Sequence, residues 1–235
     1  MNVLDDLAGG LVVSCQPLPD DPEDPMRDPY VQARVAAAVV RGGAVAVRVN
    51  GPDDITAVRP VVDVPVIGLY KHGTEGVVIT PTAAHALDVA LAGADIVAVD
   101  ATDRPRPDGR TFADTVRLIR ERTDVLILAD VATATEGVAA VEAGADAVAT
   151  TLSGYTPASP PTDGPDLGLV ARLAAQLSVP VIAEGRYRTT EQIGRAFDAG
   201  AHAVVMGNAV TSPLWITRRL VPATPRAASA PEKRE

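Results

Sequence analysis

Residues 92–98 read Ala-Gly-Ala-Asp-Ile-Val-Ala, residues 143–149 read Ala-Gly-Ala-Asp-Ala-Val-Ala, and residues 199–205 read Ala-Gly-Ala-His-Ala-Val-Val. A looser copy, Arg-Gly-Gly-Ala-Val-Ala-Val, occupies residues 41–47. Each copy follows a helix-like run, places a glycine where a helix would end, and continues into a short apolar strand. The copies lie roughly 50 residues apart, the length of two strand–helix units of a parallel sheet. The repeat therefore predicts a regular alternation of helices and parallel strands.

Further short apolar runs fall between these copies and at the start of the chain. The predicted strands cover residues 11–15, 44–49, 66–70, 95–99, 125–129, 146–150, 180–183 and 202–206. Eight strands that alternate with helices indicate an α/β protein of the (β/α)8 TIM-barrel type, built as a single domain. A doubly wound open sheet is the alternative, but its Gly-x-Gly-x-x-Gly turn follows none of these strands. We expect the barrel to span residues 1–221 and residues 222–235, rich in Pro, Ala and charge, to form a disordered tail.

Composition restricts the possible partners. Hydrophobic residues make up 47% of the chain and aromatic residues only 3%, so small branched side chains must fill the core. The formal net charge of −9 argues against nucleic acid, and an anionic ligand would need a local cluster of donors. The one cysteine, Cys15, excludes an internal disulfide and a multi-cysteine metal site. With no basic, apolar leader and no apolar run of roughly 18 residues, we expect a cytoplasmic protein without a membrane partner.

Polar residues interrupt every predicted strand at or just past its carboxyl end. They include Gln16, Arg48, Asn50, Lys71, Asp100, Asp130, Thr150, Thr151, Glu184, Arg186 and Asn208. In a parallel barrel these ends meet at one face, where barrel active sites are built.

Some of these residues carry more information than others. Lys71 and Glu184 directly follow apolar runs and should point towards the barrel mouth. Arg48 lies among valines, and a buried arginine needs a carboxylate or a ligand as its partner. Asp100 and Asp130 are equally compatible with helix caps.

The loops after the seventh and eighth strands predict a phosphate site. Barrels often hold phosphate there through backbone N–H groups at glycines. The relevant residues are Gly185 with Arg186 and Gly207 with Asn208, although two ordinary turn glycines would look the same. The Pro- and Asp-rich segment 17–29 is expected to be a long active-site loop, and Cys15 a small packed residue. No metal ligands are expected, because the three histidines share no metal-binding spacing.

Several segments resemble the N-acetylmannosamine-6-phosphate 2-epimerase family of amino-sugar and sialic acid catabolism. The resemblance runs from about residue 11 to residue 219 and is most specific at Thr150-Thr-Leu-Ser-Gly-Tyr-Thr-Pro157 and Pro180-Val-Ile-Ala-Glu-Gly-Arg186. Shorter matches are Leu11-Val-Val-Ser-Cys-Gln16, Pro65-Val-Ile-Gly68 with Lys71, and Val99-Asp-Ala-Thr102. What the resemblance implies is a cofactor-free isomerase that interconverts N-acetylmannosamine 6-phosphate and N-acetylglucosamine 6-phosphate.

The resemblance also implies roles for individual residues. Lys71 would be the proton-transfer group, assisted by Glu184. Substrate contacts would come from Gln16, Arg48, Asp130 and Arg186, with phosphate near Gly185 and Gly207. Two departures matter: the family typically carries an arginine where this chain has Ser212, and the loop Gln16–Tyr30 is unusually rich in Pro and Asp. They put the phosphate affinity and the identity of the amino sugar in question.

Other functions remain open from the residues alone. A pentose-phosphate epimerase would want metal-binding His and Asp at the strand ends, and a thiazole synthase would use a lysine Schiff base. A non-catalytic sugar-phosphate binder would have little use for both Lys71 and Glu184. A homodimer is possible, since barrels often pair through outer helices and Leu214-Trp-Ile216 would suit such a contact; packing of these residues on their own barrel is the favoured alternative.

Overall fold

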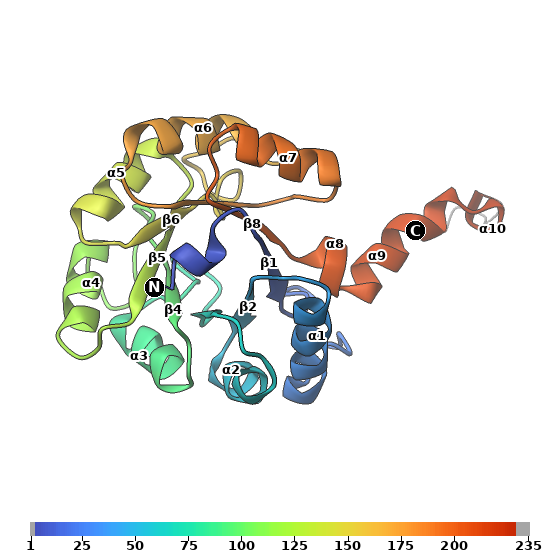
Figure 1. Ribbon diagram of the computed structural model, residues 1–235, viewed down its shortest axis with the longest axis horizontal. Helices are drawn as coiled ribbons and strands as arrows, with labels where there is room; N and C mark the ends of the chain where they lie inside the picture. The colour runs from blue at the N-terminus through green and yellow to red at the C-terminus, as the bar shows by residue number, and fades with distance from the viewer. Residues whose placement is uncertain (1–2, 229–235) are drawn as a thin grey trace.

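A closed barrel of eight parallel strands forms the centre of the molecule. The computed structural model describes residues 3–228. The strands follow one another around the barrel in chain order, and β8 pairs with β1 to close it. The helices wrap around the outside of the strands (Figure 1). The predicted single-domain (β/α)8 barrel is confirmed.

The elements have the following bounds. The strands are β1 (Leu11–Cys15), β2 (Ala46–Asn50), β3 (Val66–Leu69), β4 (Ile96–Asp100), β5 (Leu126–Asp130), β6 (Ala147–Ala149), β7 (Val181–Glu184) and β8 (Ala203–Met206). The α-helices are α1 (Pro29–Arg41), α2 (Pro52–Val58), α3 (Ala83–Leu91), α4 (Phe112–Arg120), α5 (Ala134–Glu142), α6 (Leu167–Gln176), α7 (Thr190–Asp198), α8 (Asn208–Thr211), α9 (Pro213–Leu220) and α10 (Pro225–Ala228). Short 3-10 helices are η1 (Asp5–Leu7), η2 (Arg59–Val61) and η3 (Val221–Ala223).

Most strands begin one or two residues later than predicted. In β4, β6 and β8 the reason is that the polar residue of the repeat lies outside the strand. Asp95 accepts a hydrogen bond from the backbone N–H of Val66 at 2.8 Å and pairs with Arg59. Asp146 accepts one from Ile127 at 2.6 Å and pairs with Arg120. The repeated Gly-Ala-Asp turn therefore caps the start of the preceding strand.

The core has an inner and an outer part because side chains alternate along each strand. On β4, Ile96 and Ala98 belong to the buried cluster that fills the barrel, whereas Val97 and Val99 pack against the surrounding helices. All four are at most 1% exposed, which is why these strands read as continuous apolar runs.

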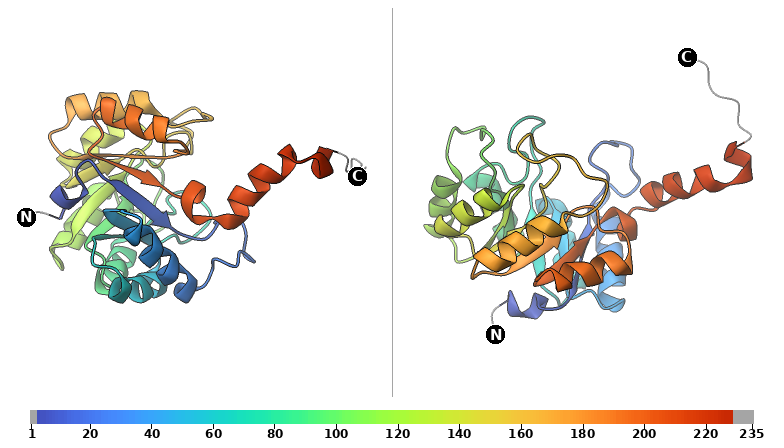
Figure 2. Two further views of the ribbon diagram at one scale, coloured as in Figure 1. Left: turned by 45° about the vertical axis from the view of Figure 1, so that its right-hand side comes forward. Right: turned by 90° about the horizontal axis from the view of Figure 1, so that it is seen from above.

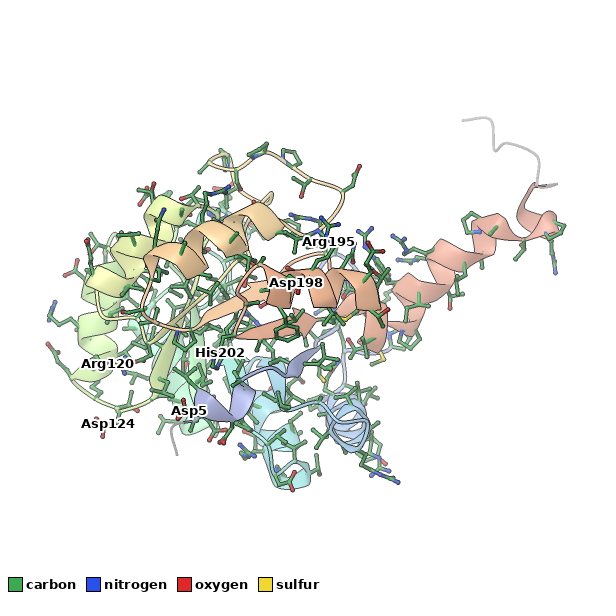
Figure 3. The ribbon with its side chains drawn as sticks, turned by 45° about the horizontal axis from the view of Figure 1, so that its top comes forward. Asp5, Arg120, Asp124, Arg195, Asp198 and His202 are labelled. Atoms are coloured by element: carbon green, nitrogen blue, oxygen red, sulfur yellow. The ribbon has the colours of Figure 1, made fainter. Side chains whose placement is uncertain are left out.

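The amino ends of the strands are closed by the start of the chain. Leu7 of η1 is fully buried in the barrel cluster, and the His202 Nε2 lies 2.7 Å from the carbonyl oxygen of Leu4. Figure 3 shows His202 and Asp5 together at this end of the barrel. The carboxyl ends of the strands are therefore left to form a site.

The C-terminal helices leave the barrel. Figures 1 and 2 show α9 pointing away from the body of the molecule, and no residue of α9 is fully buried. Packing of Trp215 on the barrel, the favoured interpretation of the sequence, is therefore only partial. Of the expected tail, residues 222–228 include part of η3 and α10, and residues 229–235 lie outside the described part of the chain. Across residues 3–228, no helix combines the length and apolar character needed to cross a bilayer.

Candidate active site

A cavity of about 360 Å³ opens at the carboxyl ends of the strands. Its wall takes residues from β1, β3, β6, β7 and β8 or from the loops directly after them, including Gln16, Lys71, Thr151, Glu184 and Gly207. Pro17 and Pro19 of the predicted active-site loop also line it. The expectation that these strand ends converge on one site is met by the geometry.

A buried ionic cluster lies at the floor of this cavity. The guanidinium of Arg48, 1% exposed, donates to both oxygens of Asp130, at 3.1 Å to Oδ1 and 2.5 Å to Oδ2. It also donates to Glu184 Oε2 at 2.5 Å. The three residues come from β2, β5 and β7, so barrel closure is what brings them together. Asp130 and Glu184 are thus the carboxylate partners that a buried arginine requires.

Arg48 and Asp130 do not line the cavity within residues 3–228. Both side chains are at most 1% exposed and lie behind Glu184, whose side chain is 14% exposed. The resemblance implies that both residues contact substrate, whereas their placement here makes them partners of Glu184.

Thr151 is a site residue that the sequence analysis did not single out. Its hydroxyl lies 2.6 Å from Asp130 Oδ1 and 3.1 Å from Glu184 Oε2, between the two carboxylates. The signal was present, because Thr151 is one of the polar residues that end the sixth strand. A hydroxyl there positions both carboxylates relative to Arg48.

Lys71 faces the cavity without a direct ionic partner. Its amino group has no carboxylate within 4.0 Å among the described residues, although Glu184 lines the same cavity. Burial lowers the pKa of Lys71, and the positive charge of Arg48 lowers it further, against the opposing charges of Glu184 and Asp130. The backbone N–H of Lys71 donates to Asn50 Oδ1 at 2.8 Å, which fixes the chain where β3 ends. Lys71 is therefore an amine with a lowered pKa aimed into a cavity.

Glu184 is shifted in the opposite direction. Burial raises the pKa of its carboxyl group, while the charge of Arg48 and the hydroxyl of Thr151 act to lower it. The site thus combines an amine that loses its proton more readily than usual with a carboxyl group that keeps its proton more readily.

Gln16 lines the cavity, and the oxygen of its side-chain amide accepts no hydrogen bond from the described residues. Its Nε2 donates to Ser14 Oγ at 2.9 Å, whereas its buried Oε1 has no partner among residues 3–228. Since a buried acceptor without a donor is costly, this oxygen is available to a ligand N–H or O–H.

The loops after β7 and β8 form the other end of the cavity. Gly185, Gly207 and Asn208 all line it, as the phosphate-site prediction requires. Gly185 has a φ of +112°, a conformation that only glycine adopts readily, so its backbone approaches the cavity without a side chain in the way.

Arg186 lines the same end of the cavity, but its guanidinium already makes hydrogen bonds within the protein. Its Nε donates to the carbonyl of Gly164 at 2.9 Å, and its Nη2 donates to Ser153 O and Thr162 Oγ1 at 2.8 and 2.9 Å. The guanidinium also stacks on Tyr155, 4.7 Å from the ring centroid. Arg186 therefore ties the β6–α6 loop to the cavity wall.

Two other polar strand-end residues have structural roles. The Asp100 carboxylate accepts from the N–H and hydroxyl of Thr102, at 3.0 and 2.7 Å, and pairs with Arg104. Burial raises the pKa of Cys15 to about 12, so its thiol stays protonated.

Within residues 3–228, no group of three or more His, Cys, Asp or Glu side chains is placed to hold a metal ion.

Comparison with known proteins places this geometry in a family. The family model described as "Putative N-acetylmannosamine-6-phosphate epimerase" matches residues 32–226. Two relatives described as "Putative N-acetylmannosamine-6-phosphate 2-epimerase" come from Cutibacterium acnes, 50% identical, and Caldanaerobacter subterraneus, 46% identical. The first match covers 92% of this chain and 93% of the relative, and the second covers 94% and 93%.

A solved structure of the same family has a closely similar fold. The N-acetylmannosamine-6-phosphate 2-epimerase from Clostridium perfringens superposes with a TM-score of 0.89 and 37% identity, over 95% of this chain and 97% of that one. A thiamine phosphate pyrophosphorylase from Pyrococcus furiosus, 15% identical with a TM-score of 0.61 over 92% and 93% of the two chains, shares the fold alone. By sequence and by structure, this chain belongs to the N-acetylmannosamine-6-phosphate epimerase family.

Proposed function

We propose that this protein interconverts N-acetylmannosamine 6-phosphate and N-acetylglucosamine 6-phosphate by removing and returning the proton on C2, as a step of amino-sugar catabolism. The observation that carries the proposal is the pairing of Lys71 and Glu184 in one cavity, with the lysine pKa lowered and the glutamate pKa raised. A base and an acid with pKa values pushed towards each other are what proton transfer in both directions requires.

Each residue has a task in the proposed reaction. The open-chain sugar presents an aldehyde at C1, which acidifies the C2 proton. Neutral Lys71 takes that proton, and the electron pair of the C2–H bond forms the C1–C2 double bond while O1 becomes negative. Glu184 donates its proton to O1, and Arg48 stabilises the glutamate that is left. The enol intermediate then turns its opposite face to Lys71, the O1 proton returns to Glu184, and the lysine ammonium gives its proton to C2. This completes the inversion and leaves both residues in their starting protonation states.

The remaining site residues bind the substrate. The unpartnered Oε1 of Gln16 is proposed to accept a hydrogen bond from the sugar. The phosphate is proposed to lie against the backbone at Gly185 and Gly207, with Asn208 beside it. Asp130 positions Arg48, and Arg186 shapes the wall through its hydrogen bonds to the β6–α6 loop.

Proton NMR in heavy water tests the reaction directly. With N-acetylmannosamine 6-phosphate as substrate, the wild-type protein should remove the C2 hydrogen signal and produce N-acetylglucosamine 6-phosphate. Lys71→Ala should lose both effects by about 10²–10⁴-fold, the usual contribution of a general base. Near-normal exchange and turnover in Lys71→Ala would rule out the assignment.

Two further outcomes separate the alternatives. Borohydride trapping of a covalent adduct at Lys71 with a keto sugar phosphate would indicate Schiff-base chemistry instead. Calorimetric binding of the sugar phosphate without any C2 exchange would indicate a non-catalytic binder.

We also propose that the protein acts in the cytoplasm and forms a homodimer. A reducing compartment suits its single cysteine, Cys15, which is a buried free thiol. The half-buried residues Leu214, Trp215 and Ile216 on the projecting helix α9 support association through an outer helix. Sedimentation at several concentrations tests the dimer, and a monomer throughout would refute it.

A further inference from the structure

The wall of the active-site cavity contains three cationic side chains, and they differ in what already binds them. Lys71 lies near Glu184 and Arg48 and belongs to the chemical end of the cavity. Arg186 donates hydrogen bonds to the backbone carbonyls of Gly164 and Ser153. Arg188 is exposed, and no acceptor or carboxylate within residues 3–228 contacts its guanidinium. Away from Lys71 and the chemical end of the cavity, Arg188 is thus the cation of the described wall that remains available for a ligand.

The backbone of Arg188 is held firmly although its side chain is free. Its N–H donates to Gln192 Oε1 at 2.7 Å, and the same oxygen accepts from Thr189 at 3.3 Å in the capping box that begins α7. Since a capping box fixes the entry of the chain into the helix, the direction in which Arg188 leaves the backbone is fixed as well.

An aromatic ring supports the guanidinium from one side. Arg188 lies 5.7 Å from the ring centroid of Trp215, which also lines the cavity. The indole is stacked a second time by Arg219, at 4.6 Å. Stacking on an aromatic face orients a guanidinium while leaving its N–H groups free, because those groups lie in the guanidinium plane.

Arg188 lies beside the two loops that are proposed to hold the phosphate. Arg188 lies in the same loop as Gly185, and the cavity wall beside them continues through Gly207 and Asn208. At a protein net charge of −9, a dianionic group needs a local cation to be held. A planar guanidinium with free N–H groups suits the oxygens of a phosphate, to which it can donate two parallel bonds.

We propose that Arg188, stacked on Trp215, is the side chain that binds the phosphate group of the substrate, whereas Arg186 holds the loop. The proposal rests on the proposed function for the identity of the sugar, but phosphate binding by Arg188 is testable without it. Hydrogen bonds to a charged group correspond to roughly a 10–100-fold change in affinity. Arg188→Ala should therefore raise both the KM for N-acetylmannosamine 6-phosphate and the inhibition constant of inorganic phosphate by about that factor, with kcat nearly unchanged.

Matched variants separate this role from loss of charge or of packing. Arg195→Ala removes an exposed arginine of α7, labelled in Figure 3, that does not line the cavity. Arg219→Ala removes the other arginine stacked on Trp215, which also does not line the cavity. Both controls should change KM and the phosphate inhibition constant by less than about twofold, while Arg188→Lys should restore part of the affinity as a point charge.

A binding readout makes the test independent of catalysis. Trp215 is the one tryptophan in the sequence, so its fluorescence reports on the stacked guanidinium. Inorganic phosphate should change this fluorescence in the wild type, and calorimetry should give weaker phosphate binding for Arg188→Ala than for Arg195→Ala. Equal phosphate binding by these two variants would overturn the proposal and leave the proposed epimerisation intact. Absence of C2 exchange in the wild type would instead remove the proposed function without deciding the role of Arg188.

Discussion

The guanidinium of Arg48 bonds both oxygens of Asp130 across the floor of the barrel and reaches Glu184 from the same Nη1 atom, at 2.5 Å. The cluster joins β2, β5 and β7, so the carboxyl group that faces the cavity is anchored by two strands that do not neighbour its own. The proposed chemistry and the stability of the fold therefore depend on the same contact.

Replacement of Arg48 should destabilise the protein strongly. Arg48→Met removes the cation and leaves two carboxyl groups buried without it, a situation that costs about 3–5 kcal/mol. Urea denaturation of the two proteins measures this loss in the free energy of unfolding. A loss below about 1 kcal/mol would contradict the picture of a closed, buried cluster.

The loss should also depend on pH in a defined direction. Arg48 lowers the Glu184 pKa, so its removal raises the folded-state pKa further above the unfolded value. A carboxyl group shifted in this way favours the folded state below its unfolded pKa, and that contribution disappears as the pH rises through the folded pKa. The destabilisation by Arg48→Met should therefore be greater near about pH 8 than near about pH 5.

Glu184→Gln should change both the rate and its pH profile. Loss of the acid should lower kcat by about 10²–10⁴-fold. The charge of Glu184 raises the Lys71 pKa, so its removal should move the acidic limb of the kcat/KM profile, where Lys71 loses its proton, to lower pH. Glu191→Gln, at an exposed glutamate in the first turn of α7, should leave the rate and the limb unchanged. A limb that moves to higher pH in Glu184→Gln would contradict the assignment of Lys71 as the base.

Thr151→Val should weaken the site with little change in volume. The hydroxyl lies between Asp130 and Glu184 and lowers the Glu184 pKa, so its loss should reduce kcat by roughly 10–100-fold. Thr151→Ser keeps the hydroxyl and should retain most of the activity. Equal kcat values for the Val and Ser variants would mean that the hydroxyl has no part in catalysis.

Two glycines should respond oppositely to alanine. Gly185, at φ +112°, lines the cavity, so Gly185→Ala should introduce about 1–3 kcal/mol of backbone strain and raise KM. Gly194 lies inside α7 with no atom within 4 Å of an added Cβ, so Gly194→Ala should stabilise the protein by about 0.5–1 kcal/mol without changing KM. Thermal unfolding and steady-state kinetics of both variants check the pair.

The sequence alone determined the barrel and the end at which its site lies. The repeated Gly-Ala-Asp turn fixed the alternation of helices and strands, because a glycine ends each helix and an apolar run begins each strand. Lys71, Glu184 and Gln16 line one cavity, since parallel strands that close into a barrel present all their carboxyl ends together.

Only the tertiary structure decided how deep each residue lies and which partner it has. Arg48 and Glu184 are 136 residues apart in sequence, and periodicity gives the face of a strand but not the side chains opposite it across a closed barrel. For the same reason the sequence did not single out Thr151, whose hydroxyl lies between two carboxylates. Arg186 was expected to be free to bind substrate, although its guanidinium donates a hydrogen bond to the β6–α6 loop. The local sequence pattern therefore determines which residues lie at the carboxyl ends of the strands. Long-range packing determines which hydrogen-bond and ionic partners each of them has there.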